Sequence, residues 1–145
     1  MINDPHFVAL QNMYLAAPIN AFYRPTIQVS DGEATIEIDI SDKFFHSGGA
    51  VHGAVYFKML DDAAFFAVNS LERNVFVLTT SFTTRFTRPV RSGRLRSVGR
   101  VIDRKKSQFI ADAVVYDSAG NEVGRGSGVF VLSKIPLGEA LGYAG

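Results

Sequence analysis

Residues 46–62 read HSGGAVHGAVYFKMLDD, and this stretch joins a glycine-rich turn to the start of a long apolar helix. The Ser-Gly-Gly step at 47–49 can take backbone angles that other residues resist. From about residue 51 to 70 the chain is apolar nearly all round, which predicts a helix that is buried on most of its sides. Asp61 and Asp62 nevertheless stand in its middle. Two acids in a buried helix need a physical reason, because an ionised carboxylate is costly to remove from water.

The segments around this helix predict an α+β domain with a mostly antiparallel sheet. Residues 4–17 have apolar residues at helical spacing, after an acid that can cap and a proline that suits a first turn. Two strand-like runs at 26–30 and 33–41 flank the tight-turn pair Asp31-Gly32. After residue 74 the chain is rich in β-branched and aromatic residues and predicts about four further strands. We therefore expect one domain over residues 1–145.

Composition excludes several kinds of site. There is no cysteine, which rules out disulfides, thiolate zinc sites and a cysteine nucleophile. Three histidines are too few and too scattered for a convincing metal site. The first residues lack the basic start of a signal peptide, and no apolar run approaches the ~20 residues of a membrane span. We expect a soluble, cytoplasmic protein without a metal.

Basic residues are concentrated in one part of the chain. Nine of the 15 lysines and arginines, but one of the 14 acids, lie between Arg85 and Lys106. The net charge is only +1, so this local excess suggests a small anionic ligand more than a nucleic-acid track. A solvated strand face rich in arginine explains the same pattern equally well. No stacking aromatics interleave with the arginines in a recognisable nucleic-acid module, and we expect no nucleic-acid partner.

Two segments resemble the hotdog-fold thioesterases of the phenylacetate-degradation (PaaI-like) group. His52-Gly53-Ala54, with Asp61 nine positions after His52, is similar to that group's HGG…D…A signature. The segment from Leu78 to Val90, which ends in Arg-Pro, is similar to a strand of the same family. The resemblance covers roughly residues 7–133. It implies a hotdog fold, in which a curved antiparallel sheet wraps around one long central helix.

The resemblance also implies a reaction, the hydrolysis of an acyl- or aryl-CoA thioester. The Gly53 amide would polarise the carbonyl, His52 would shape the turn, and Asp61 would act as base on water or as nucleophile. A hydroxyl at Thr79 would help to hold the water. His46 departs from the family, because many relatives have asparagine there, and a histidine titrates near neutral pH.

Asp61 lies about 13 Å along the helix from its start. One chain cannot easily bring both ends to one carbonyl, and the family solves this with a dimer in which the acid of one subunit faces the helix start of the other. We therefore expect a homo-oligomer, either a dimer or a homotetramer built as a dimer of dimers.

The same resemblance suggests which residues hold the substrate. Arginine pairs with phosphate through two hydrogen bonds, so part of the basic cluster could bind the nucleotide end of CoA. Phe57 and Phe65 on the central helix would line the acyl pocket. No cofactor is expected, since CoA is part of the substrate. The predicted CoA contacts are Arg88, Arg91, Arg94 and Arg104.

Two other functions fit a hotdog domain. A non-catalytic module that binds acyl-CoA would not require an acid at Asp61, and such modules usually carry a DNA-binding domain. A hotdog dehydratase or hydratase is less well supported, because position 60, fourteen residues after His46, is leucine rather than an acid. Lys58 can pair with either Asp61 or Asp62. We favour Asp61 as the functional acid and regard Asp62 as structural.

Overall fold

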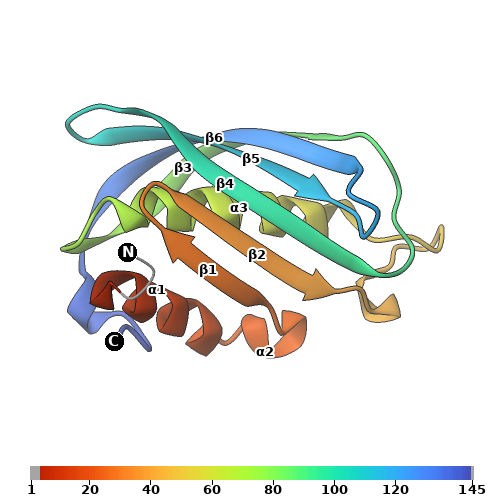
Figure 1. Ribbon diagram of the computed structural model, residues 1–145, viewed down its shortest axis with the longest axis horizontal. Helices are drawn as coiled ribbons and strands as arrows, with labels where there is room; N and C mark the ends of the chain where they lie inside the picture. The colour runs from red at the N-terminus through yellow and green to blue at the C-terminus, as the bar shows by residue number, and fades with distance from the viewer. Residues whose placement is uncertain (1–3, 145) are drawn as a thin grey trace.

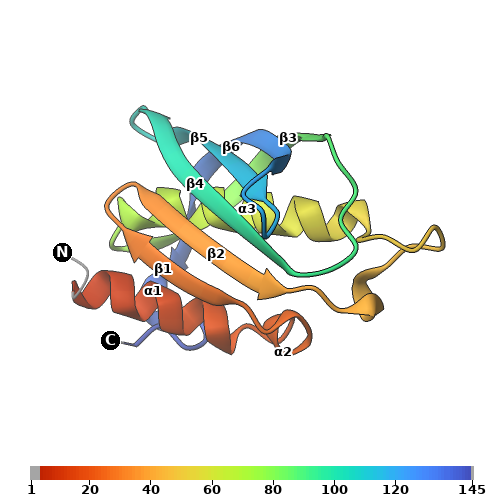
Figure 2. The ribbon, with the colours of Figure 1, turned by 45° about the vertical axis from the view of Figure 1, so that its right-hand side comes forward.

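A computed structural model describes residues 4–144, so the ends of the expected domain, residues 1–3 and 145, lie outside the described residues. One six-stranded sheet curves around the helix α3 (Gly53–Ser70), as Figures 1 and 2 show. Every strand pair is antiparallel among the described residues, and the strand order is β1-β2-β4-β5-β6-β3. The predicted hotdog architecture is confirmed. The strands are β1 (Thr26–Ser30), β2 (Glu33–Asp39), β3 (Val75–Phe86), β4 (Arg94–Arg104), β5 (Gln108–Tyr116) and β6 (Glu122–Pro136).

The predicted N-terminal helix is α1 (Pro5–Ala16), and the cap expected at Asp4 is present. The Asp4 carboxylate accepts a hydrogen bond from the His6 amide at 2.9 Å. The sequence did not predict the short helix α2 (Asn20–Tyr23) or the 3₁₀ turns at Asp42–Phe44 and Leu137–Glu139. Each is one turn or less, too short to display a helical period.

The central helix begins at Gly53, two residues later than the sequence predicted. Val51 is not helical because it forms an isolated β-bridge with Phe45. His52 has extended backbone angles (φ −63°, ψ 142°), and its ring caps the helix. A tertiary contact therefore overrides the helical tendency of this segment, and the correction places the first free helix amide at Gly53.

Small residues let the sheet lie close against α3. A Cβ added at Gly99 of β4 would lie 2.3 Å from the Ala63 backbone, so only glycine fits there. Gly126 and Gly128 of β6 make room for the Phe82 ring in the same way. Close packing is what these glycines provide.

β3 forms one edge of the sheet, and only its side facing β6 is paired in the described chain. Apolar side chains are exposed on and near this edge: Phe57 (40% exposed), Leu78 (43%) and Phe86 (47%). A long edge strand with exposed apolar side chains is prone to pair with another chain. Within the described residues, no helix is long and apolar enough to cross a membrane.

Candidate active site

One stripe of α3 is not covered by the sheet and faces a cavity of about 620 Å³. The stripe runs from Ala54 through Asp61 to Phe66, with residues three and four apart that share one helix face. α1, α2 and the start of β3 form the other walls, which are mostly aromatic and aliphatic. The acids in the middle of the helix therefore line a cavity. The polar lining residues are Tyr14, Asn20, Lys58, Asp61, Asp62 and Thr79.

Asp61 is paired with Thr79 of β3. The Thr79 hydroxyl on β3 donates a hydrogen bond of 2.9 Å to Asp61 Oδ1. Burial, helped by the neighbouring Asp62 charge, raises the pKa of the Asp61 carboxyl to about 6, even though the Thr79 hydrogen bond and Lys58 oppose the rise. A carboxyl that ionises near neutral pH is suited to accept a proton during a reaction.

Asp62 is held in a separate polar network. The Tyr14 hydroxyl donates to Asp62 Oδ2 at 2.6 Å, and the Lys58 ammonium forms an ion pair with the same oxygen. Lys58 also donates to Asn20 Oδ1 at 2.8 Å. Burial and the Asp62 charge raise the pKa of Tyr14, so its hydroxyl stays a donor. Lys58 thus pairs with Asp62 rather than with Asp61. The network joins α1, α2 and α3.

At the start of α3, the first helical amide is free of hydrogen bonds. His52 Nδ1 accepts from the Ala54 amide at 2.9 Å, and the His52 carbonyl accepts from the Val55 amide at 2.9 Å. The Gly53 amide between them donates to no other residue in the described chain. A free amide at a helix N-terminus, where the dipole is positive, can stabilise a developing oxyanion.

His46 lies beside this helix start. Its Nδ1 accepts from the Gly48 amide at 2.9 Å, and its ring centroid is 6.5 Å from that of His52. The predicted catalytic residues therefore form two groups in one chain, one around His52 and Gly53 and one around Asp61 and Thr79. About 13 Å of helix separates them.

The four arginines predicted to contact CoA do not form one cluster in the chain. Arg88 and Arg91 lie in the β3–β4 connection beside the start of α3, since the Arg88 carbonyl accepts from the Tyr56 hydroxyl of that helix at 2.8 Å. Arg94 begins β4, and Arg104 ends it, about 33 Å away along the strand.

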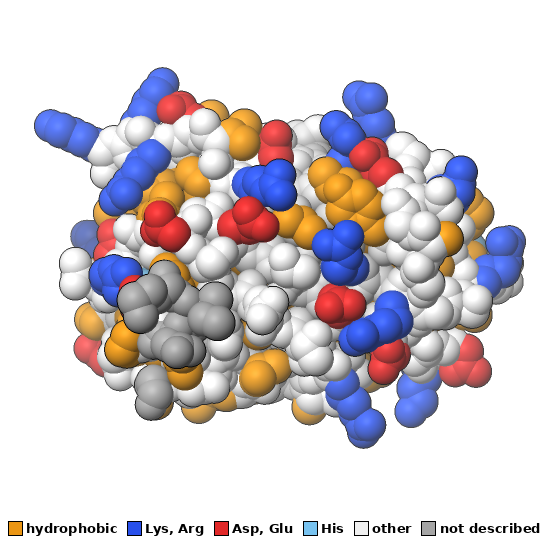
Figure 3. Space-filling view, viewed as in Figure 1, with side chains coloured by type: hydrophobic (Ala, Val, Ile, Leu, Met, Phe, Trp, Pro, Cys, Tyr) orange, Lys and Arg blue, Asp and Glu red, His pale blue; other side chains and the backbone are white. Residues whose placement is uncertain are grey.

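Two of these arginines also have partners within the chain. Arg94 forms ion pairs with Glu37 and Asp39, and Arg104 lies over the Phe109 ring. Figure 3 shows Lys and Arg interspersed with Asp and Glu on this side of the molecule. Much of the basic cluster therefore belongs to a mixed-charge sheet surface.

Both predicted acyl-pocket residues line the cavity. The Phe57 ring packs against Phe82 of β3, with 5.7 Å between the ring centroids. The Phe65 ring packs against Phe66 and Phe76, each with a centroid distance of 5.1 Å. Sequence reasoning missed the wall residues Phe76, Leu78 and Tyr23, because a single apolar residue in a strand or a one-turn helix carries no pattern that separates a cavity wall from the core.

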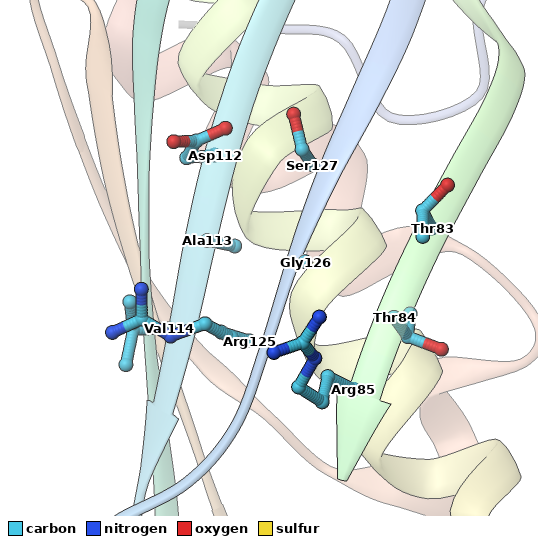
Figure 4. Close-up of a pocket in the computed structure, with 9 residues that line it drawn as sticks. All are labelled: Thr83, Thr84, Arg85, Asp112, Ala113, Val114, Arg125, Gly126 and Ser127. Carbon is cyan, nitrogen blue, oxygen red and sulfur yellow. The ribbon is translucent and has the colours of Figure 1, made fainter.

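Figure 4 shows a separate surface hollow, on the face of the sheet that points away from α3. It measures about 350 Å³ and contains Arg85 and Arg125, of which Arg125 is paired with Glu122. None of the predicted site residues lines it. Among residues 4–144, no three His, Asp or Glu side chains lie close enough together to hold a metal ion.

Comparison with known proteins identifies relatives among thioesterases and esterases. A sequence model described as the thioesterase superfamily matches residues 48–123. A Saccharolobus solfataricus protein named as a candidate esterase is 26% identical over 107 residues, covering 74% of this chain and 71% of that protein.

Solved structures show the same fold. The Escherichia coli PaaI protein, from the phenylacetic acid degradation operon, has a TM-score of 0.81 at 19% identity, covering 92% of this chain and 99% of that one. A mutant thioesterase from Pseudomonas aeruginosa has a TM-score of 0.77 at 15% identity, with 88% and 92% of the two chains covered.

Proposed function

The chain belongs to the thioesterase superfamily, and on that premise we propose that it hydrolyses an acyl-CoA thioester to a free acid and CoA. The observation that carries this proposal is the Asp61–Thr79 pair in the wall of a largely apolar cavity. The apolar cavity can hold an acyl chain. The Asp61 carboxylate can then attack the thioester carbonyl carbon, directly or through a water molecule. In this proposal the reaction needs no metal or further cofactor.

The proposed chemistry uses Asp61 in one of two ways. As a general base, it takes a proton from a water molecule while the water oxygen attacks the thioester carbonyl. As a nucleophile, its own oxygen attacks and water then releases the acid. In both routes the carbon–sulfur bond breaks and the CoA sulfur leaves with a proton. Both routes need Asp61 ionised, so the rate should rise with pH through about 6.

The carbonyl oxygen needs a donor, and we assign this role to the Gly53 amide of a partner subunit. Asp61 contacts Thr79 of β3, while Gly53 lies against Phe86 at the other end of that strand. In this assignment, the free edge of β3 pairs antiparallel with the same edge of the partner subunit, and the two-fold axis passes between Phe82 and Thr83. Thr79 of one chain then lies opposite Phe86 of the partner subunit, and Asp61 meets the partner's helix start.

This pairing gives the neighbouring residues consistent roles. It covers the exposed side chains of Phe57, Leu78 and Phe86 along the β3 edge. His46 and His52 hold the turn that presents the Gly53 amide. Arg88 and Arg91 flank the same helix start, where the CoA moiety would leave the carbonyl, and they are the arginines best placed to bind its phosphates.

The test is hydrolysis of a panel of aryl and straight-chain acyl-CoAs by the wild type, Asp61→Asn and Asp62→Asn. Asparagine keeps the size of the carboxylate and removes its basicity. Asp61→Asn should lower the turnover number by two or more orders of magnitude. Asp62→Asn disturbs the neighbouring network and removes a charge that raises the Asp61 pKa, but it leaves the Asp61 carboxylate in place and should keep most of the activity at neutral pH.

Two outcomes count against the proposal. If no thioester is hydrolysed but acyl-CoA binds tightly, the protein is a binding module. If turnover is unaffected by Asp61→Asn, the acid is structural and the catalytic assignment is wrong.

A further inference from the structure

A second cavity lies beside the Asp61 cavity and is lined only by apolar residues. It measures about 300 Å³, and its seven lining residues come from the end of α1, the start of β3, the end of β6 and the C-terminal segment. Ile135 (46% exposed) and Leu141 (63%) form its outer end. Exposed aliphatic side chains that surround one hollow indicate a surface that binds something apolar.

The two cavities share part of their walls. Met13, Ala17 and Phe76 line both of them. The two cavities therefore adjoin at these residues, with Asp61 and Thr79 in the first cavity and Leu141 in the second. All the polar lining residues belong to the Asp61 end, since the second cavity has none. This gradient matches a ligand with one polar, reactive end and one long apolar end.

The C-terminal wall of the second cavity is fixed to the fold. Leu137 is buried, with 1% exposure. The Tyr143 hydroxyl lies 2.7 Å from His6 Nδ1, and Asn12 donates to the Ala144 carbonyl at 2.6 Å. A cavity whose wall is anchored to α1 is formed before a ligand arrives, which lowers the entropic cost of binding.

The length of this surface sets the length of the ligand. From Thr79 to Phe76 the strand advances by three residues, or about 10 Å. An extended chain of single bonds gains about 1.2 Å a bond, as three backbone bonds span about 3.6 Å, so about eight bonds cover this distance. An aryl or short acyl group would stay beside Asp61, and only a longer chain reaches the second cavity.

We propose that the two cavities together bind the straight alkyl chain of a medium- to long-chain acyl-CoA, with its carbonyl at Asp61 and its terminal methyl group against Leu141. This inference rests on the proposed thioesterase function and specifies its substrate class. A chain in the second cavity exchanges water for an apolar wall, and each further buried CH₂ group strengthens binding. Phe76 lines both cavities, so its ring determines which acyl chains can extend from the first cavity into the second.

The test compares straight-chain acyl-CoAs of increasing length on the wild type and on Leu141→Asp. Wild-type kcat/KM should rise with chain length beyond about eight carbons, as the chain enters the second cavity. Leu141→Asp places a carboxylate at the far end and should lower kcat/KM for the long chains about tenfold or more. Short and aryl substrates should be unaffected.

Leu15→Asp is the matched control, because Leu15 is also exposed (51%) and lines neither cavity. It should leave the chain-length profile unchanged. Ala17→Leu fills the junction from the residue after α1 and should shorten the preferred chain length.

Three outcomes overturn the inference while leaving the thioesterase function intact. The first is hydrolysis confined to aryl or short acyl groups, and the second is an equal effect of Leu141→Asp on all chain lengths. The third is a lower oligomer mass for Leu141→Asp than for the wild type on light scattering, which would mean that a second copy of the chain covers this surface. Loss of the thioesterase function itself would appear differently, as no hydrolysis of any thioester.

Discussion

Two adjacent acids on α3 have different environments, and the difference is the reason for the different roles proposed for them. Asp62 receives a hydroxyl and an ammonium group, from Tyr14 and Lys58, which satisfy its charge. Asp61 receives one hydroxyl, from Thr79, and keeps an oxygen free in the cavity. Burial then raises the pKa of Asp61. The spacing motif indicates which acid to choose, but only the fold supplies the physical reason.

At this residue scale, Thr79→Val tests how Asp61 is tuned. Valine has nearly the shape of threonine but donates no hydrogen bond, so the ionised form of Asp61 loses its donor. The pKa of Asp61 should rise above its present value of about 6, because the Thr79 hydrogen bond holds it down. Since the ionised form is active, the acidic limb of the kcat–pH profile should move to higher pH. Thr79→Ser should restore it, and an unshifted profile in Thr79→Val would show that Thr79 does not tune the acid.

The Gly53 amide can also be tested by a pair of substitutions. Proline is well tolerated at the first position of a helix, and the extended angles of His52 suit the residue before a proline. Gly53→Pro should fold and yet lower kcat by ~10²–10³-fold, since it removes the amide donor at the helix start. Gly53→Ala brings the same Cβ close to Phe86 but keeps the N–H, so it should stay active. Equal activity of the two variants would contradict a role for this amide.

At the scale of elements, apolar periodicity predicted α1, the central helix and the succession of strands along the chain. Long elements reveal their period, and tertiary contacts rarely override it. The same reasoning placed the helix start at residue 51, because it could not see that Val51 pairs with Phe45. It also missed α2, whose Asn20 carries one of the acceptors for Lys58. Contacts between elements far apart in sequence have no local signal, and the network of Tyr14, Asn20, Lys58 and Asp62 is made of them.

This network should contribute to stability, because it ties α1 and α2 to α3. Lys58→Met leaves the Asp62 carboxylate without its cation, and both side chains of the pair are at most one-fifth exposed. The free energy of unfolding should fall by about 2–3 kcal/mol, somewhat less than for a fully buried pair. The double variant Lys58→Met with Asp62→Leu should recover much of this loss. Denaturant titrations at one fixed protein concentration measure both, and strictly additive losses would mean that the pair is not coupled.

At the scale of the whole molecule, the proposed site is not complete within one chain. The acid and the free helix amide are about 13 Å apart on the same rigid helix, and no side-chain movement closes that gap. The fold nevertheless puts each of them next to one end of the same edge strand, β3. If that edge pairs with a second copy about a two-fold axis, Asp61 of one subunit comes next to the Gly53 amide of the other without any change in the fold of either chain. Composition and periodicity could not predict this, because a sheet edge is known only when the strand order is known.

The central claim is that Asp61 of one subunit and the Gly53 amide of another act on the same thioester. Co-expression of Asp61→Asn and Gly53→Pro chains with two different tags, followed by purification on both tags, isolates the mixed oligomer. In a mixed dimer one site carries both substitutions and the other carries neither, so hydrolysis should recover to about half of the wild-type rate. Each variant alone should remain nearly inactive. A mixed oligomer as inactive as its parents would contradict the claim, because it would mean that each site lies within a single chain.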